Sequence, residues 1–111
     1  MMKTGLLIKT NDEVSLIEFN QLSDLYPIVG CNMIEVAYPK AWPGYVLLID
    51  EEGKYKEKNN INIVGTLAYG RMPYDVIVGD MVVCRKGLSD LEGLTSSDIK
   101  LLKEYIGEQK K

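Results

Sequence analysis

The run Tyr45-Val-Leu-Leu-Ile-Asp50 is the clearest strand signal in the chain. No polar residue interrupts its apolar stretch, so the run predicts a central strand that is covered on both faces. Residues 33–38 give a further strand signal that ends at Pro39, and residues 40–44 form a turn before the central strand. After the run, Glu51-Glu-Gly53 turns the chain away.

Further strands are expected on either side of this centre. Residues 4–10 and 14–19 predict an N-terminal β-hairpin, because Asn11-Asp-Glu13 between them has the composition of a tight turn. Residues 76–78 and 81–85 predict two more strands, separated at Gly79-Asp80 by a bulge or a tight turn.

Two short helices are expected between the strands. Apolar residues at helical spacing predict one within residues 20–30, and Pro27 keeps it short because proline removes a backbone donor. Residues 61–69 predict the second, capped by Asn59 or Asn60.

A third, C-terminal helix is predicted over residues 96–107. Thr95 and Asp98 have the spacing of a capping box, and Leu94 and Ile99 that of a hydrophobic staple. The elements predict one small α+β domain over residues 1–111, with a mostly antiparallel sheet of about five or six strands, two or three helices, and the C-terminal helix packed on the sheet.

Composition limits the function. The chain has 111 residues, a net charge of −3 and no histidine. The absence of histidine removes Ser-His and Cys-His nucleophiles and every histidine-ligated metal site. The acidic balance disfavours binding to duplex nucleic acid, which draws on lysine and arginine. No apolar run approaches the roughly 20 residues that span a bilayer, so we expect a cytoplasmic protein with no membrane partner.

Few other side chains point to chemistry, and no cofactor motif is present. Cys31 and Cys84 lie among apolar residues and are expected to be buried, reduced thiols. Asp50-Glu51-Glu52 has no metal-loop spacing and is interpreted as a solvated turn, so no metal is expected. Asp75 and Asp80 either form a carboxylate pair for acid–base work or accept hydrogen bonds from the backbone at the loop and at the Gly79 turn.

The candidate binding residues gather around Arg71. A guanidinium on a loop made rigid by Pro73 is suited to bind a carboxylate or phosphate, and its structural alternative is a salt bridge to Asp75. Tyrosines combine a ring with a polar tip and favour ligand clefts and interfaces, although strand-edge packing is their commoner role. The candidate ligand-binding set is Tyr69, Arg71, Tyr74, Asn60 and Trp42.

Several segments together resemble a known family. They are Leu25-Tyr-Pro-Ile-Val-Gly-Cys-Asn-Met-Ile-Glu35, Ile49-Asp-Glu-Glu-Gly53, Asn60 with Gly65-Thr-Leu, and Asp75-Val-Ile-Val-Gly-Asp80. They resemble the domain-of-unknown-function family numbered 3846, which is found in phages, plasmids and bacterial genomes, over about residues 5–86. The resemblance supplies no catalytic residues. It implies an accessory gene of a mobile element, in the host cytosol if the gene is phage-encoded.

These observations favour a non-catalytic binding protein of a phage or mobile element. Such a protein sequesters a small anionic, nucleotide-like ligand or blocks a host defence component. The alternative is a homo-oligomeric protein–protein interaction module. An enzyme using Asp75 and Asp80 is the least supported hypothesis, because the sequence has no histidine, metal motif or phosphate-binding glycine loop.

Overall fold

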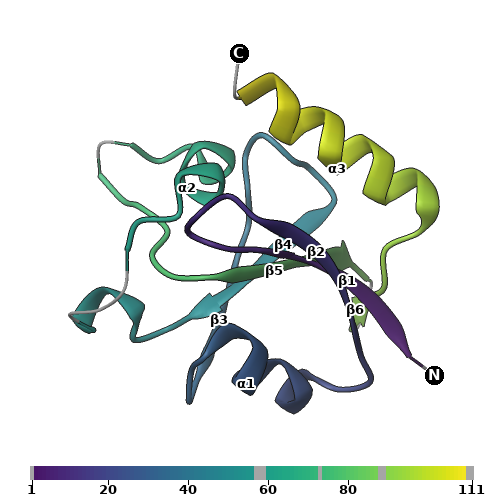
Figure 1. Ribbon diagram of the computed structural model, residues 1–111, viewed down its shortest axis with the longest axis horizontal. Helices are drawn as coiled ribbons and strands as arrows, with labels where there is room; N and C mark the ends of the chain where they lie inside the picture. Colours follow the sequence, from purple (N-terminus) through teal and green to yellow (C-terminus); the bar gives the residue numbers. More distant parts are fainter. Residues whose placement is uncertain (1, 57–59, 73, 88–89, 110–111) are drawn as a thin grey trace.

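An antiparallel sheet forms the centre of the molecule in the computed structural model, which describes residues 2–56, 60–72, 74–87 and 90–109 (Figure 1). The strand order is β2-β1-β5-β4-β3, and β6 pairs with the end of β5. Every strand pair is antiparallel, which confirms the predicted α+β class. The strands are β1 (Lys3–Ile8), β2 (Val14–Phe19), β3 (Ile34–Ala37), β4 (Tyr45–Asp50), β5 (Met81–Lys86) and β6 (Leu91–Glu92).

Strand β4 is buried at every position, as its apolar run predicts. Its side chains alternate between two cores: Leu47 and Ile49 belong to one, and Val46 and Leu48 to the other. Strand β5 lies beside it at the middle of the sheet and divides its residues in the same way. An uninterrupted apolar run is therefore the mark of a strand with a core on each face.

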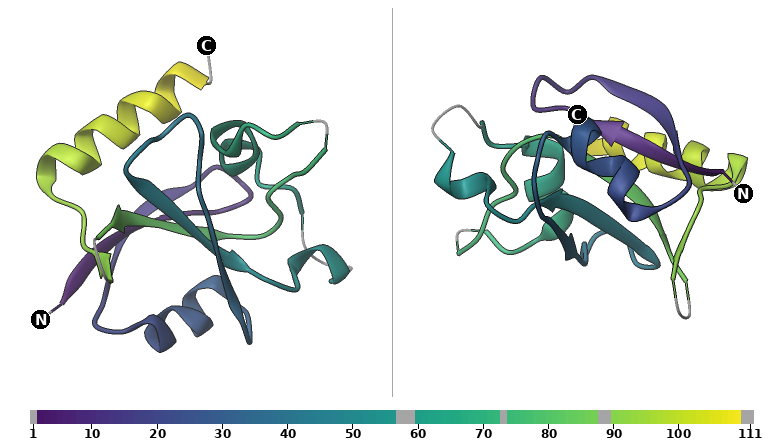
Figure 2. Two further views of the ribbon diagram at one scale, coloured as in Figure 1. Left: turned by 180° about the vertical axis from the view of Figure 1, so that it is seen from behind. Right: turned by 90° about the horizontal axis from the view of Figure 1, so that it is seen from below.

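Helices cover both faces of the sheet (Figure 2). On one face lie α2 (Ile63–Tyr69) and α3 (Ser96–Gln109), whose buried residues join the core of Leu47 and Ile49. On the other lie the 3₁₀ helix η1 (Leu22–Leu25) and α1 (Tyr26–Val29), which contribute Leu25 and Val29. A second 3₁₀ helix, η2 (Gly53–Tyr55), follows β4. No helix among the described residues is both long and apolar enough to cross a membrane.

The segment before β5 differs from the prediction. Residues 76–78 do not form a strand; only an isolated bridge joins Val78 to Ile61. The backbone N–H of Ile77 instead donates to the Thr66 hydroxyl at 2.9 Å, and the Ile77 carbonyl accepts from Asn62 N–H at 2.8 Å. Helix α2 thus takes the hydrogen bonds that a neighbouring strand would have used.

The first turns of the helices also refine the prediction. Helix α2 begins at Ile63 with Asn62 as its N-cap, not at residue 61 with Asn60, and Asn59 lies outside the described residues. The expected short helix divides into η1 and α1, with Pro27 in the first turn of α1. Proline is tolerated there because a first-turn N–H has no intrahelical acceptor.

The N-terminus of α3 is fixed to the sheet through Asp98. Its carboxylate accepts hydrogen bonds from Thr95 N–H at 2.8 Å and from the Tyr45 hydroxyl at 2.7 Å. The Thr95 hydroxyl accepts from Asp98 N–H at 3.2 Å, which completes the predicted capping box. Partial burial opposes ionisation of Asp98, but these hydrogen bonds and nearby Arg85 lower its pKa. Burial, followed by the bond to Asp98, raises the pKa of Tyr45 to about 12.

Asp98→Ala is expected to lower the free energy of unfolding by about 1–2 kcal/mol at neutral pH, because it removes the cap and the bond to Tyr45. The pKa of Asp98 is lowered by folding, so its stabilising effect is complete above the ordinary aspartate pKa of about 3.9 and is lost as the pH falls through the folded value. Urea unfolding across this pH range measures both effects. Glu104→Ala, at an exposed position of α3, is the control. An equal loss at neutral pH and at about pH 2 would contradict the assignment.

Candidate functional site

Two of the predicted binding residues, Arg71 and Tyr74, lie on the loop that follows α2. Gly70 ends the helix in the left-handed conformation (φ 73°), which glycine adopts without strain. The Arg71 carbonyl then accepts hydrogen bonds from the N–H groups of Tyr74 and Asp75, at 2.9 and 3.1 Å. Arg71 and Tyr74 are both exposed, Tyr74 to 93%. Pro73, expected to stiffen the loop, lies outside the described residues.

Arg71 does not form the salt bridge to Asp75 that was its structural alternative. Its guanidinium lies over the Tyr69 ring, 5.3 Å from the centroid, within the range of a cation–π contact. Asp75 is paired with Lys54 of η2. Tyr69 is the last residue of α2, and Arg71 and Tyr74 lie on the loop that follows, where both are exposed.

The other two predicted residues lie elsewhere. Trp42 is only 1% exposed and stacks on Tyr105 of α3, with ring centroids 6.3 Å apart. It is a core residue that no ligand reaches, and this corrects its place in the candidate set. Asn60 is exposed, and its backbone carbonyl accepts a hydrogen bond from Gly79 N–H at 2.8 Å.

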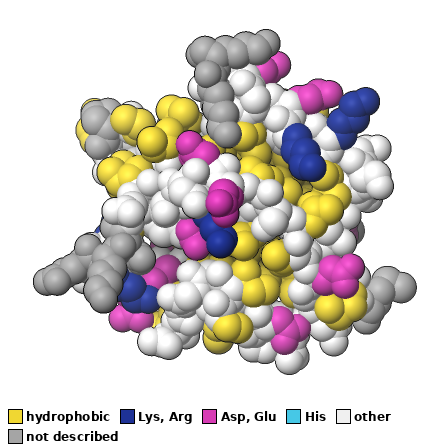
Figure 3. Space-filling model, viewed as in Figure 1, with side chains coloured by type: hydrophobic (Ala, Val, Ile, Leu, Met, Phe, Trp, Pro, Cys, Tyr) yellow, Lys and Arg dark blue, Asp and Glu magenta, His cyan; other side chains and the backbone are white. Residues whose placement is uncertain are grey.

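A groove of about 230 Å³ with an apolar lining lies beside the Arg71 loop. Figure 3 shows apolar side chains gathered at the upper left of the molecule, where α2 lies in Figure 1. The side chains of Ile63 and Met72 are each 58% exposed. One short helix and the loop after it therefore expose an unusually large apolar surface. We call this feature the apolar groove; its lining is Ile61, Ile63, Thr66, Leu67, Met72 and Val76.

The apolar groove was not predicted from the sequence. Its signal is the composition of α2, Ile-Val-Gly-Thr-Leu-Ala-Tyr, which has no charged residue on any face. One face, including Val64 and Ala68, packs into the core. A surface helix without charged residues on its outer face leaves apolar side chains such as Ile63 and Leu67 in water.

A second hollow, of about 180 Å³, lies on the other side of Val76. Glu35 of β3 pairs with Ile49 of β4, so these two side chains share one face of the sheet. Glu51 follows β4 and continues the pairing, because its N–H donates to the Met33 carbonyl at 3.0 Å. We call this feature the acidic cavity; its lining is Glu35, Ile49, Asp50, Glu51, Lys54, Tyr55, Tyr69, Asp75, Val76, Ile77 and Val78.

Asp50 is not part of a solvated turn, which corrects its interpretation from the sequence. Its side chain is 2% exposed, and its carboxylate lies 2.6 Å from Lys56 Nζ. The opposite oxygen accepts from Glu52 N–H at 2.9 Å. The bond to Asp50 raises the pKa of Lys56, and burial, followed by the Asp50 charge, raises the pKa of Cys31 nearby. Lys56 therefore compensates the charge of Asp50.

The remaining predicted groups have structural partners. Asp75 accepts from Val76 N–H at 2.9 Å, as predicted. Asp80 accepts from Thr10 N–H at 3.0 Å, which corrects its expected place at the Gly79 turn. Cys31 and Cys84 are buried free thiols, as expected. Among the described residues, no group of three or more His, Cys, Asp or Glu side chains is placed to hold a metal ion.

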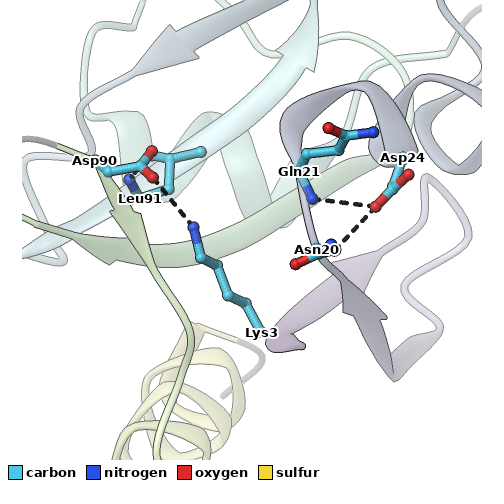
Figure 4. Close-up of polar contacts among 6 residues, drawn as sticks. All are labelled: Lys3, Asn20, Gln21, Asp24, Asp90 and Leu91. Atoms are coloured by element: carbon cyan, nitrogen blue, oxygen red, sulfur yellow. Dashed lines mark hydrogen bonds and ion pairs between the residues drawn. The ribbon is translucent and has the colours of Figure 1, made fainter. Parts of the chain in front are cut away.

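A third concavity, of about 300 Å³, lies where β1 and β6 approach the start of η1 (Figure 4). Lys3 Nζ donates to Asp90 at 3.3 Å, while Asp24 accepts from the N–H groups of Asn20 and Gln21 at 2.9 and 3.1 Å. These backbone hydrogen bonds lower the pKa of Asp24. The charged groups here bind one another or the backbone, so we interpret them as structural.

Asn62 holds the candidate site in place and was missed as a functional residue. Its side chain is buried, accepts from Gly65 N–H, and donates to the carbonyls of Ile8 and Gly79, each at 3.0 Å. It thereby joins the start of α2 to the end of β1 and to the turn before β5. The signal was its position as a cap-type residue directly before the helix.

Asn62→Ala is expected to destabilise the protein by about 2–4 kcal/mol, because it removes the cap and two buried hydrogen bonds to the carbonyls of Ile8 and Gly79. Chemical denaturation measures the change. Asn11→Ala is the matched control, since Asn11 is exposed and accepts only one local bond, from Glu13 N–H. Its expected cost is under about 1 kcal/mol. Equal effects of the two substitutions would contradict the role of Asn62.

Comparison with known proteins gives one match. A family model described as a domain of unknown function, DUF3846, matches residues 2–107. No curated protein and no solved structure matched the chain.

Proposed function

This chain belongs to the DUF3846 family, and we propose that it is a non-catalytic binding protein that docks onto another protein through the apolar groove. The observation that carries the proposal is the exposed apolar surface of α2 and the following loop, where Ile63, Leu67 and Met72 face solvent. A contiguous exposed apolar surface on a soluble protein is typical of a protein interaction site. In the mobile-element setting that the family resemblance implies, the partner is a host protein.

The residues around the groove support a protein partner. Met, Tyr and Arg are enriched at the centres of protein interfaces, and Met72, Tyr74 and Arg71 lie together on the loop. Arg71 is held over the Tyr69 ring, so less side-chain freedom is lost when it binds. Rigid aromatic and arginine anchors of this kind are common hot spots of binding.

A protein partner is better supported than a nucleotide-like anion. The acidic cavity, at about 180 Å³, is smaller than the roughly 300–1,000 Å³ of pockets that enclose a small-molecule ligand. Its carboxylates would also repel an anion. A homo-oligomer through the same surface would bring two acidic cavities toward one interface, which favours a different protein as the partner.

The test is affinity capture from a bacterial lysate with the wild-type chain and the double variant Leu67→Asp/Met72→Asp. Burying an unpaired carboxylate in an apolar interface is costly, so capture by the double variant should fall by at least about tenfold. The matched control is Leu16→Asp, because the exposure of Leu16, 53%, lies between that of Leu67 and that of Met72, and Leu16 lies on β2 outside the groove.

Two results would contradict the proposal. One is that no protein is enriched by the wild-type chain, and the other is that both variants lose capture equally. Light scattering on the same samples tests the homo-oligomer. A mass that doubles for the wild-type chain and returns to that of a monomer in the groove variant would assign the groove to self-association instead.

A further inference from the structure

The apolar groove and the acidic cavity adjoin each other at one residue. Val76 lines both hollows, and the bridge between Ile61 and Val78 fixes the extended segment that separates them. A partner that covers the groove therefore also meets the cavity. Its chemistry has to suit an apolar lining on one side of Val76 and a carboxylate lining on the other.

The cavity has negative charge that the protein does not neutralise. Lys54 pairs with Asp75, and Lys56 pairs with Asp50. Among the described residues, neither Glu35 nor Glu51 has an ion-pair partner. Both are exposed.

Glu51 directly follows β4, and its N–H donates to the Met33 carbonyl at 3.0 Å, so the pairing with the β3 side continues to this residue. Glu51 therefore lies diagonally from Glu35, a relation that places Cα atoms about 7–8 Å apart. Two like charges at that separation repel each other, and a cation between them would relieve the repulsion. Lys54, which lines the cavity, forms its ion pair with Asp75 and with neither glutamate. This is an electrostatic reason to expect a cation from a partner.

Two further features suit a side-chain cation. Tyr55 and Tyr69 line the cavity, and tyrosine rings attract ammonium and guanidinium groups, as the Arg71 guanidinium over the Tyr69 ring illustrates. Lys54, also in the lining, already pairs with a carboxylate there, so the cavity accepts this kind of group. The cavity volume of about 180 Å³ suits one side chain better than a whole small-molecule ligand.

We propose that this combined surface takes a basic, amphipathic segment of the partner protein. An apolar side chain of that segment lies in the groove, and a lysine or arginine side chain enters the cavity between Glu35 and Glu51. The inference rests on the proposed function and adds to it the chemical class of the partner.

The experiment uses two synthetic peptides with the same leucine and phenylalanine positions. One carries lysine and the other glutamate at the remaining positions, and fluorescence anisotropy measures their affinities for the full chain. The lysine peptide is expected to bind at least about tenfold more tightly. Its advantage should shrink as salt is added, because the carboxylates lie near the surface.

Matched variants assign the preference to the cavity. Glu35→Gln/Glu51→Gln should bring the two affinities to within about threefold of each other, while Glu18→Gln/Glu92→Gln, with the same change in charge, should keep the wild-type preference. The control glutamates are exposed and lie on β2 and β6, outside both linings. Leu67→Ser should weaken both peptides alike.

Failure of this inference is separate from failure of the proposed function. Equal affinities, tighter binding of the glutamate peptide, absence of binding, or an equal effect of the two glutamine pairs would each overturn the basic class of partner. If affinity capture still depends on Leu67 and Met72, the protein-binding function stands without it. If affinity capture fails as well, both the protein-binding function and the basic class of partner are contradicted.

Discussion

The buried amide of Asn62 is the constraint on which the binding surface depends. One side chain satisfies the N–H of Gly65 and the carbonyls of Ile8 and Gly79, which belong to a helix, a strand and a turn far apart in the sequence. An amide has both donors and an acceptor, and burial makes each unpaired backbone group costly. These hydrogen bonds hold the start of helix α2 in its position over the sheet.

That position explains the two hollows. Thr66 of α2 accepts from Ile77 N–H, so residues 76–78 run along the helix and not along a strand. Gly65 permits the close approach, since a Cβ atom there would lie 2.7 Å from the Met81 sulfur. Helix and segment together leave the apolar groove on one side and the acidic cavity on the other, above the ends of β3 and β4. The buried polar groups of Asn62 and Thr66 thus determine where an apolar hollow and an acidic hollow lie next to each other on the surface.

The features that the sequence predicts correctly are those with a local or periodic sequence pattern. The buried run of β4, the capping box at Thr95 and the family pattern needed no tertiary information. The remaining features depend on partners distant in sequence. Residues 76–78 look like a strand until Thr66 takes their hydrogen bonds. Trp42 looks like a surface aromatic in a turn until Tyr105 of α3 stacks on it. From the sequence, Asp75 is a candidate salt-bridge partner of Arg71, but in the structure it forms its ion pair with Lys54 of η2.

Hydrogen–deuterium exchange with and without the lysine-rich peptide tests most directly whether α2 and its loop form the binding surface. Exchange should slow on binding in residues 60–72 and 74–79 and at the end of β4, with no change in β2. Protection of β2 or α3, with none around α2, would contradict the claim.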